Sequence, residues 1–328
     1  MKFYNDYYDI IKSAMSEDQS ITLGFDGEIS KGIDLKAFLN ESKQSNLLPS
    51  LQNFASQIGR QPDFSRKLGA HPDFQHLKGT DETENHYIVS MFIDIKGSTN
   101  LFSKYSNEAV LIITKTIQRA AIHTCLIFDG YIHRLQGDGL LVYFGGKGVT
   151  RKNAVENALL ASSMFTYFVK NDLKNLFEEQ DIKRIATRIG IDFGGDKDVL
   201  WSMAGIGEIS EITTCSLHTN LAAKMQLEAE TNGIVVGDNI KSNFDTDYYT
   251  VVSKRTGDEN DRYIFRNPAD NFNYTQYDFN WLNFLKEQDF IVTDLNGNLL
   301  LKQKPTHIPS TSSLGAIASQ NTPYLFIP

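Results

Sequence analysis

The sequence predicts an α+β fold with a mixed, largely antiparallel sheet flanked by helices. Residues 87–95 ("YIVSMFIDI") form an apolar, β-branched run that is typical of a buried strand. Two further apolar runs, "GYIHRL" and "LLVYFG", flank the turn "QGDG" and predict a β-hairpin. Helical patterns alternate with these strands, and an antiparallel hairpin among them argues against a doubly wound parallel sheet.

The helical elements on both sides of the hairpin are predicted from their patterns. Residues 1–83 carry short helical patterns such as "LLPSLQNFASQIG" and end in the acidic "GTDETEN", which reads as an exposed linker. Helical stretches follow the strand across Leu101–Phe128, and another helix is expected over residues 151–180. We therefore expect an N-terminal helical flank over residues 1–83.

The elements after the hairpin complete the central unit, expected over residues 84–267. They are a strand "IATRIGIDFG", a looped segment "AGIGEISEITTCS", a helix from about Thr219 that stops before Gly233, a strand "GIVVG" and a last hairpin "YYTVVSK…DRYIF". Residues 268–328 are expected as a small extension with a polar linker "ADNFNYTQ", a helix "FNWLNFLKEQ", an "NGN" hairpin and a disordered "PTHIPSTSSLG". "FGGKG" and "FGGDK" are interpreted as turns at strand ends.

Composition limits the classes of function. With 32 basic and 40 acidic residues, the net charge of -8 argues against broad nucleic-acid binding, so the expected partner is a small molecule. Cys125 and Cys215 have no C-x-x-C spacing, which predicts neither a disulfide framework nor a zinc site. The first twenty residues lack a signal-peptide core, and no run approaches about 20 apolar residues. A soluble, cytoplasmic protein without membrane insertion is expected.

Two aspartates give the first indication of chemistry. Asp94 ends an apolar strand, where a bare carboxylate is costly unless it is paired, protonated or bound to a metal. Asp138 lies in the turn of the neighbouring hairpin, where "DG" alone is an ordinary turn signal. On adjacent strands the two carboxylates could bridge two hard cations, and a helix beginning near Ser98 would offer backbone N–H groups to phosphate.

Five ordered segments resemble the signature segments of class III nucleotidyl cyclases over about residues 85–265: "FIDIKGSTNL", "RLQGDGLLVYF", "RIGIDFG", "MAGIG" and "HTNLAAKMQ". The resemblance implies a class III cyclase core that works as a head-to-tail homodimer on a nucleoside triphosphate. It also implies two Mg²⁺ or Mn²⁺ ions per site, held by Asp94, Asp138 and the carbonyl of Ile95. Gly97, Ser98 and Thr99 would bind the triphosphate, although Ser98 replaces the family's usual aromatic residue.

The resemblance implies that the partner subunit completes each site. Asn220 would orient the ribose, and Lys224, four residues later on the same helix face, takes the place of the arginine that neutralises charge on the α-phosphate. Lysine lacks the bidentate fork of arginine, so Arg188 is a possible substitute. Lys254 and Arg255 lie where the family places a lysine on the β- and γ-phosphates.

The base-reading positions depart most from the family pattern. Where adenylate cyclases have lysine and aspartate, this chain has Arg134 and Thr213. Arginine only donates and threonine is short and can donate or accept, so the adenine-reading pair, which needs an acceptor for the adenine amino group, is absent. The combination resembles the uridylate and cytidylate cyclases of bacterial Pycsar anti-phage systems, whose cyclic product acts on a separately encoded effector. Arg134 as donor favours UTP, with CTP next.

Two other functions stay open at this point. One is an adenylate cyclase with atypical base contacts. The other is a catalytically weak, cyclase-like module that binds nucleotide, which Lys224 and Thr213 would favour.

Overall fold

A computed structural model describes residues 47–302, apart from residues 70, 180–181, 184 and 254–255. The expected N-terminal helix is α3 (Leu47–Gln57), followed by a short 3₁₀ turn η1 (Pro72–Leu77). The acidic segment predicted as a linker ends in a strand, β1 (Thr83–Asn85). The expected C-terminal "PTHIPSTSSLG" lies outside the described residues, as do the helical patterns before residue 47.

The main sheet has the strand order β10-β11-β8-β5-β2-β4-β3. At its centre β2 (Ile88–Ile95) pairs antiparallel with β4 (Gly139–Phe144) and with β5 (Thr187–Gly194). β3 (Tyr131–Gln136) forms the predicted hairpin with β4, and β8 (Gly233–Gly237) runs parallel to β5. The predicted α+β class with a mixed, largely antiparallel sheet is confirmed.

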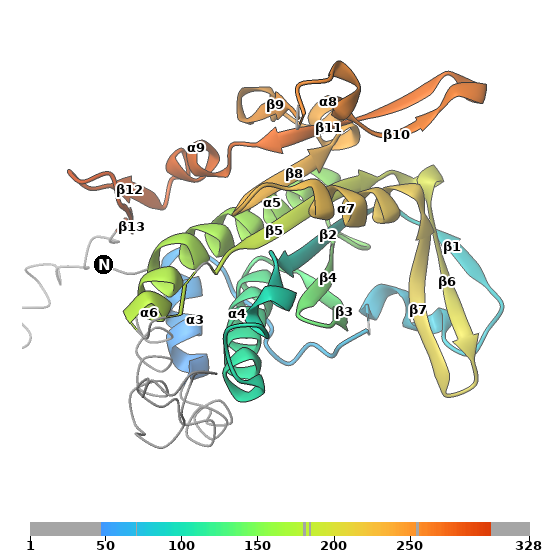
Figure 1. The fold of residues 1–328 in the computed structure, drawn as a ribbon. Helices are drawn as coiled ribbons and strands as arrows, with labels where there is room; N and C mark the ends of the chain where they lie inside the picture. The colour runs from blue at the N-terminus through green and yellow to red at the C-terminus, as the bar shows by residue number, and fades with distance from the viewer. Residues whose placement is uncertain (1–46, 70, 180–181, 184, 254–255, 303–328) are drawn as a thin grey trace, which may run out of the picture.

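Helices cover both faces of this sheet (Figure 1). One face packs against α4 (Asn107–Ile127) and α5 (Arg151–Phe168), which continues through a π-helical turn η3 (Val169–Leu173) into α6 (Lys174–Glu179). By length and composition α4 could cross a membrane, but 61% of its apolar window is buried inside the protein, as expected for a core helix. The helical stretches predicted across Leu101–Phe128 correspond to α4, which begins later than expected, at Asn107.

The opposite face carries α7 (Leu217–Glu228), which lies directly on β5. The contact is close at Gly190, where an added Cβ would lie 2.1 Å from the Ala222 carbonyl and 2.3 Å from the Gln226 amide nitrogen. Its neighbours Ile189 and Ile191 point into the other core, as strand alternation requires. The glycine of "RIGIDFG" thus lets the helix approach the sheet.

The segment predicted as a loop over "AGIGEISEITTCS" is instead a two-stranded ribbon. β6 (Val199–Ile206) pairs with β7 (Ile209–Ser216), and β1 pairs with β6 on its other side. Trp201 anchors the base of the ribbon by stacking on Phe74 of η1, with ring centroids 3.9 Å apart. The loop prediction was wrong because packing on this apolar cluster outweighs the two glycines of the segment.

The last predicted hairpin was also wrong. β9 (Thr250–Val252) and β10 (Tyr263–Asn267) do not pair with each other but both pair with β11 (Phe272–Phe279). From Phe272 onward, the polar segment expected as a linker therefore lies in β11, which joins the main sheet through β8. The remaining elements are α8 (Asp238–Asn243), α9 (Trp281–Lys286) and the predicted "NGN" hairpin, β12 (Ile291–Thr293) with β13 (Leu299–Leu301).

Candidate active site

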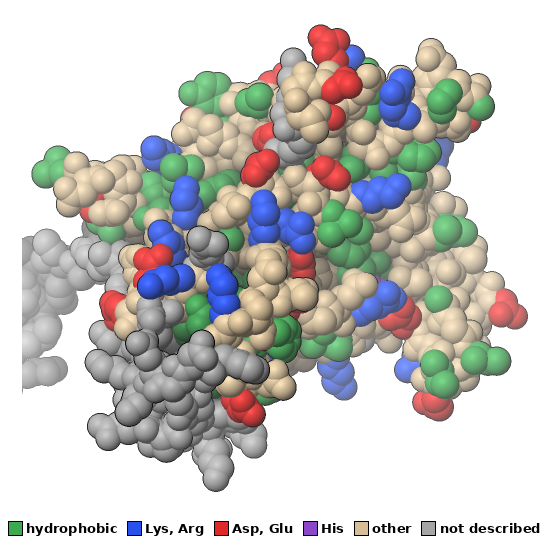
Figure 2. All heavy atoms as spheres, in the orientation of Figure 1, with side chains coloured by type: hydrophobic (Ala, Val, Ile, Leu, Met, Phe, Trp, Pro, Cys, Tyr) green, Lys and Arg blue, Asp and Glu red, His purple; other side chains and the backbone are tan. Residues whose placement is uncertain are grey.

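Asp94 lies near the end of the central strand β2 and is paired rather than bare. Its Oδ2 accepts hydrogen bonds from Arg188 Nη2 at 2.8 Å and from Gln226 Nε2 at 3.2 Å. Arg188 is its direct cross-strand neighbour on β5, and Gln226 comes from α7. Figure 2 shows Lys and Arg side chains gathered in the middle of the face in view, with acidic side chains among them. The charge at the strand end is therefore stabilised by a guanidinium.

Asp138 lies in the turn between β3 and β4, close to Asp94. Burial, and then the charge of Asp94, raise the pKa of Asp138 above its ordinary value, while hydrogen bonds from Ser98 and the Ile95 backbone act the other way. Its Oδ2 is buried and has no hydrogen-bond partner. Gly139 brings the turn close, since a Cβ there would lie 2.8 Å from the Ile93 carbonyl and 3.5 Å from Asp94 Oδ1.

This arrangement fits a divalent cation. Two carboxylates that repel each other, one with an unpaired buried oxygen, are stabilised by a positive ion, and hard oxygen ligands suit Mg²⁺ or Mn²⁺. The described residues contain no group of three or more His, Cys, Asp or Glu side chains that could hold a metal. An ion here would therefore depend on two carboxylates together with carbonyl and substrate oxygens.

The predicted phosphate cradle is a short turn. Gly97 has a left-handed backbone (φ 73°), and residues Ser98–Leu101 form a four-residue 3₁₀ helix. The helix expected to begin near Ser98 is this 3₁₀ helix, and the α-helix α4 begins only at Asn107. Gly97, Ser98 and Thr99 nevertheless begin only three residues after Asp94, and Ser98 hydrogen-bonds Asp138.

Asn220 and Lys224 do not meet the two aspartates within one chain. Both are exposed on α7, and Lys224 Nζ lies 5.9 Å from the ring centroid of Phe265. Gln226 of the same helix contacts Asp94. Lys224 lies two residues before Gln226, a rotation of about 200°, and Asn220 lies six residues before it, which leaves a rotation of about 240° after one full turn. Asn220 and Lys224 therefore face away from the Asp94 of their own chain.

The residues predicted to read the base lie on one face of the ribbon and beside β3. Arg134 forms an ion pair with Glu211 of β7, and its Nε lies 3.3 Å from Glu211 Oε2. Thr213, two residues further along β7, points to the same face as Glu211. Lys254 and Arg255, expected on the phosphates, lie outside the described residues.

Sequence reasoning missed Glu211 and Gln226 and left the position of Arg188 open. Glu211 was missed because its segment was expected to be a loop, so no strand placed it beside Arg134. The pairing of Arg188 with Asp94 follows only from the strand register, in which these residues are opposite each other.

The chain is similar in sequence to curated proteins, although no family model matches it. It is 40% identical over 226 residues to the cytidylate cyclase of Staphylococcus aureus, covering 67% of this chain and 53% of that protein. It is 32% identical over 230 residues to a cytidylate cyclase of Escherichia coli, covering 67% of this chain and 47% of that protein. The chain thus spans about half the length of the curated relatives it matches.

Two solved structures align with part of the chain. One is the adenylyl cyclase CyaB from P. aeruginosa, with 20% identity and a TM-score of 0.47, covering 60% of this chain and 95% of that chain. The other is the guanylyl cyclase Cya2, with 14% identity and a TM-score of 0.48, covering 61% of this chain and 93% of that chain. From its sequence relatives, the predicted resemblance to pyrimidine nucleotide cyclases is confirmed, and the chain is a relative of proteins named cytidylate cyclase.

Proposed function

We propose that this protein is a pyrimidine nucleotide cyclase, a lyase that converts a pyrimidine nucleoside triphosphate to the 3′,5′-cyclic monophosphate and pyrophosphate. The observation that carries the proposal is the pair Asp94 and Asp138, with the unpaired buried Oδ2 of Asp138. The sequence similarity to cytidylate cyclases supports it. In the reaction the ribose 3′-hydroxyl gives its proton to solvent and its oxygen bonds to the α-phosphorus. The bond from that phosphorus to the oxygen bridging to the β-phosphate breaks, and pyrophosphate leaves with that oxygen.

Asp94 and Asp138, with the Ile95 carbonyl, are the residues that would hold two Mg²⁺ or Mn²⁺ ions. Such ions lower the pKa of a coordinated hydroxyl and neutralise charge on the phosphates. Gly97, Ser98 and Thr99 then bind the triphosphate, next to the carboxylates. Arg188 lies beside Asp94 and adds positive charge on the same side.

For the base we propose CTP as the preferred substrate and UTP as the alternative, which reverses the order expected from Arg134 alone. Glu211 adds an acceptor beside the donor Arg134. Cytosine presents an amino donor at N4 next to acceptors at N3 and O2, so a carboxylate and a guanidinium match it together. Uracil has a carbonyl acceptor at position 4, which a carboxylate does not bind.

We further propose a homodimer with sites at the subunit interface. Asn220 and Lys224 face away from Asp94 of their own chain, so a second chain is needed to bring them to it. Asn220 would orient the ribose and Lys224 would neutralise the developing charge on the α-phosphate, as in the family it resembles. The same resemblance is the basis for proposing a cytoplasmic enzyme whose product acts on a separate effector in anti-phage defence.

The test is Mn²⁺-dependent product formation from CTP by the parent protein and by Asp94→Ala and Asp138→Ala. Both variants are expected to lose cyclase activity while their thermal unfolding midpoints stay close to that of the parent. Isothermal titration with Mn²⁺ alone should show weaker binding in both. Turnover at the parent's rate in either variant would refute the assignment of the two carboxylates, and a folded parent that binds nucleotide without turnover would favour the binding module.

A further inference from the structure

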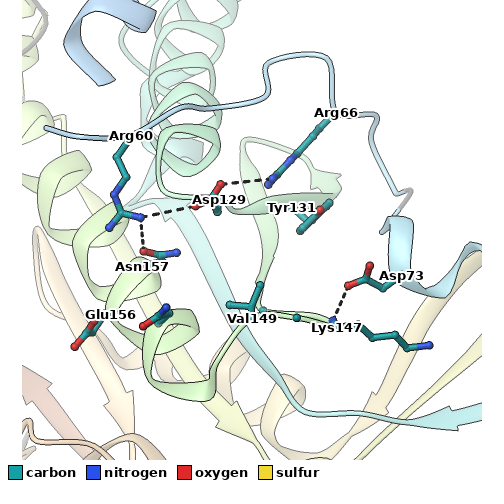
Figure 3. A pocket seen from close by; sticks show the side chains of 12 residues that line it. Arg60, Arg66, Asp73, Asp129, Tyr131, Lys147, Val149, Glu156 and Asn157 are labelled. Atoms are coloured by element: carbon teal, nitrogen blue, oxygen red, sulfur yellow. Dashed lines mark hydrogen bonds and ion pairs between the residues drawn. The ribbon is translucent and has the colours of Figure 1, made fainter. Parts of the chain in front are cut away.

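Figure 3 shows a cavity lined by Arg60, Arg66 and Asp129. It has a volume of about 550 Å³ and lies at the other end of β4 from Asp94 and Asp138. β4 begins at Gly139, beside Asp94, and the cavity begins after its last residue, at Gly145. Six strand residues span about 20 Å, so this cavity is separate from the candidate active site. Its volume is in the range of pockets that bind small molecules, roughly 300–1,000 Å³.

Two arginines from the segment after α3 converge on one carboxylate at the cavity wall. Arg60 Nη1 lies 3.7 Å from Asp129 Oδ2, and Arg66 Nη2 lies 3.5 Å from Asp129 Oδ1. Charge-assisted hydrogen bonds are usually about 2.7–2.9 Å long, so Asp129 holds both guanidinium groups only loosely. Figure 3 shows the two arginines pointing toward Asp129 from opposite sides.

Other contacts orient these two guanidinium groups without using most of their donors. Arg60 Nη1 donates to Asn157 Oδ1 at 2.8 Å, and Arg66 Nη1 donates to the Gly130 carbonyl at 3.2 Å. Arg66 also lies over the Tyr131 ring, 4.3 Å from its centroid. An arginine side chain has five N–H donors. Within the described residues, Arg60 and Arg66 each make one side-chain hydrogen bond.

The glycine-rich "FGGKG" segment and the start of α5 form the facing wall. At Gly148 (φ 83°) an added Cβ would meet nothing within 4 Å, so the backbone there borders open space. α5 follows at once, and its Asn153 and Glu156 line the cavity. The N-terminus of a helix carries a partial positive charge that favours anions. Lys147 instead turns its amino group to Glu84, 2.6 Å away.

We propose that this cavity binds a small phosphorylated metabolite. Its phosphate lies between Arg60 and Arg66 and replaces the loosely held Asp129 carboxylate. A tetrahedral dianion accepts hydrogen bonds from two directions at once, which suits two guanidinium groups on opposite sides. Asn153 and Glu156 then accept hydrogen bonds from the hydroxyl groups of the ligand.

Two isosteric variants test the proposal with effects of opposite sign. Asp129→Asn removes the internal competitor and keeps a residue that tolerates the left-handed backbone at this position (φ 62°). It is expected to tighten binding by about threefold or more. Asn157→Asp places a carboxylate against Arg60 and is expected to weaken binding about tenfold, as is Arg66→Ala. Binding is measured by isothermal titration with inorganic phosphate and with ribose 5-phosphate, in EDTA without nucleotide.

Controls separate this cavity from the active site. Arg188→Ala, an arginine removed beside Asp94, is expected to leave phosphate binding unchanged, and ribose is expected not to bind. Ribose 5-phosphate should bind several-fold tighter than inorganic phosphate. The proposal is overturned if neither phosphate probe binds the folded parent, if Asp129→Asn and Asn157→Asp share the parent's affinity, if both probes bind equally, or if Arg188→Ala alone weakens binding. Because no metal or nucleotide is used, the result does not depend on the proposed cyclase activity.

Discussion

Charged side chains inside this protein are stabilised by specific partners, and Asp192 is the most buried of them. Its side chain is fully buried, and Oδ2 lies 2.8 Å from His218 Nδ1 while Oδ1 accepts a hydrogen bond from the Tyr274 hydroxyl at 2.8 Å. His218 lies two residues before Asn220 on α7. Burial opposes the positive charge of His218, but the Asp192 carboxylate outweighs it and raises the pKa of His218. The pair fixes the first turn of the helix.

The pair predicts a pH-dependent stability. Because folded His218 holds its proton more tightly than an unfolded histidine, its stabilisation is complete below pH 6.5 and is lost as the pH rises through its raised pKa. His218→Gln should reduce the free energy of unfolding by about 3 kcal/mol at pH 6 and remove this pH dependence. Urea unfolding between pH 6 and 9 measures the free energy of unfolding and its pH dependence. The control is His76→Gln, since His76 is exposed. An unchanged slope in His218→Gln would contradict the role of the pair.

The base contacts give a second prediction at the scale of residues. Glu211→Gln replaces an acceptor-only carboxylate by an amide that also donates, so kcat/KM for CTP should fall about tenfold while UTP gains relative to CTP. Arg134→Ala should lower kcat/KM for both pyrimidines, since both use its donors. Steady-state rates with the two substrates measure the change. An unaltered CTP to UTP ratio in Glu211→Gln would remove Glu211 from base recognition.

Among the elements, α7 connects the sheet, the ribbon and both halves of the candidate site. Its Thr219 hydroxyl lies 2.8 Å from Ser90 of β2 and 3.1 Å from Thr214 of β7. Thr214 in turn lies 2.9 Å from the Tyr143 hydroxyl of β4. This chain of hydroxyl groups fixes the helix relative to three strands, and Gly190 sets its distance from a fourth.

Gly190→Ala tests how closely α7 must approach β5. The added methyl group would overlap the Ala222 carbonyl and the Gln226 amide, so the helix must shift. We expect a loss of about 2 kcal/mol in the free energy of unfolding and a larger relative loss of activity, because Gln226 and Asn220 move together. Gly195→Ala is the matched control, since its Cβ would meet only the end of the Asp198 side chain, at 3.1 Å. Equal effects of the two substitutions would contradict this explanation.

The sequence predicted those elements whose own pattern determines them. The buried run that ends in Asp94 and the hairpin around Asp138 were read from alternation and a turn signal, so both carboxylates were found. β11 was missed because its polar segment becomes a strand only through pairing with β8, β9 and β10. The partners Arg188 and Glu211 required a register that no local pattern contains.

On the scale of the whole molecule, the proposed function divides the site between two chains, because Asn220 and Lys224 face away from Asp94 of their own chain. The ribbon also projects from the body and exposes Ile206 (79%) and Ile209 (82%) at its tip. Exposed apolar side chains of this kind are typical of surfaces that contact another chain. Both features agree with the proposed dimer.

The dimer predicts complementation between inactive chains. Asp94→Ala removes one half-site and Lys224→Ala the other, so a heterodimer of the two keeps one intact site. After subunit exchange at equal concentrations, about a quarter of the parent activity should return. Either variant mixed with itself provides the control. No recovery under conditions in which subunits demonstrably exchange would mean that each site is built within one chain.

The measurement that tests the central claim most directly is incubation of the parent protein with each of the four nucleoside triphosphates and Mn²⁺, with products resolved by mass. The carboxylates of Asp94 and Asp138 predict a cyclic product and pyrophosphate. Arg134 as donor and Glu211 as acceptor predict that CTP reacts fastest, to 3′,5′-cyclic CMP, followed by UTP, with little product from ATP or GTP. Faster conversion of ATP than of either pyrimidine would contradict the base assignment, and the absence of any cyclic product from folded, Mn²⁺-bound protein would contradict the proposed function.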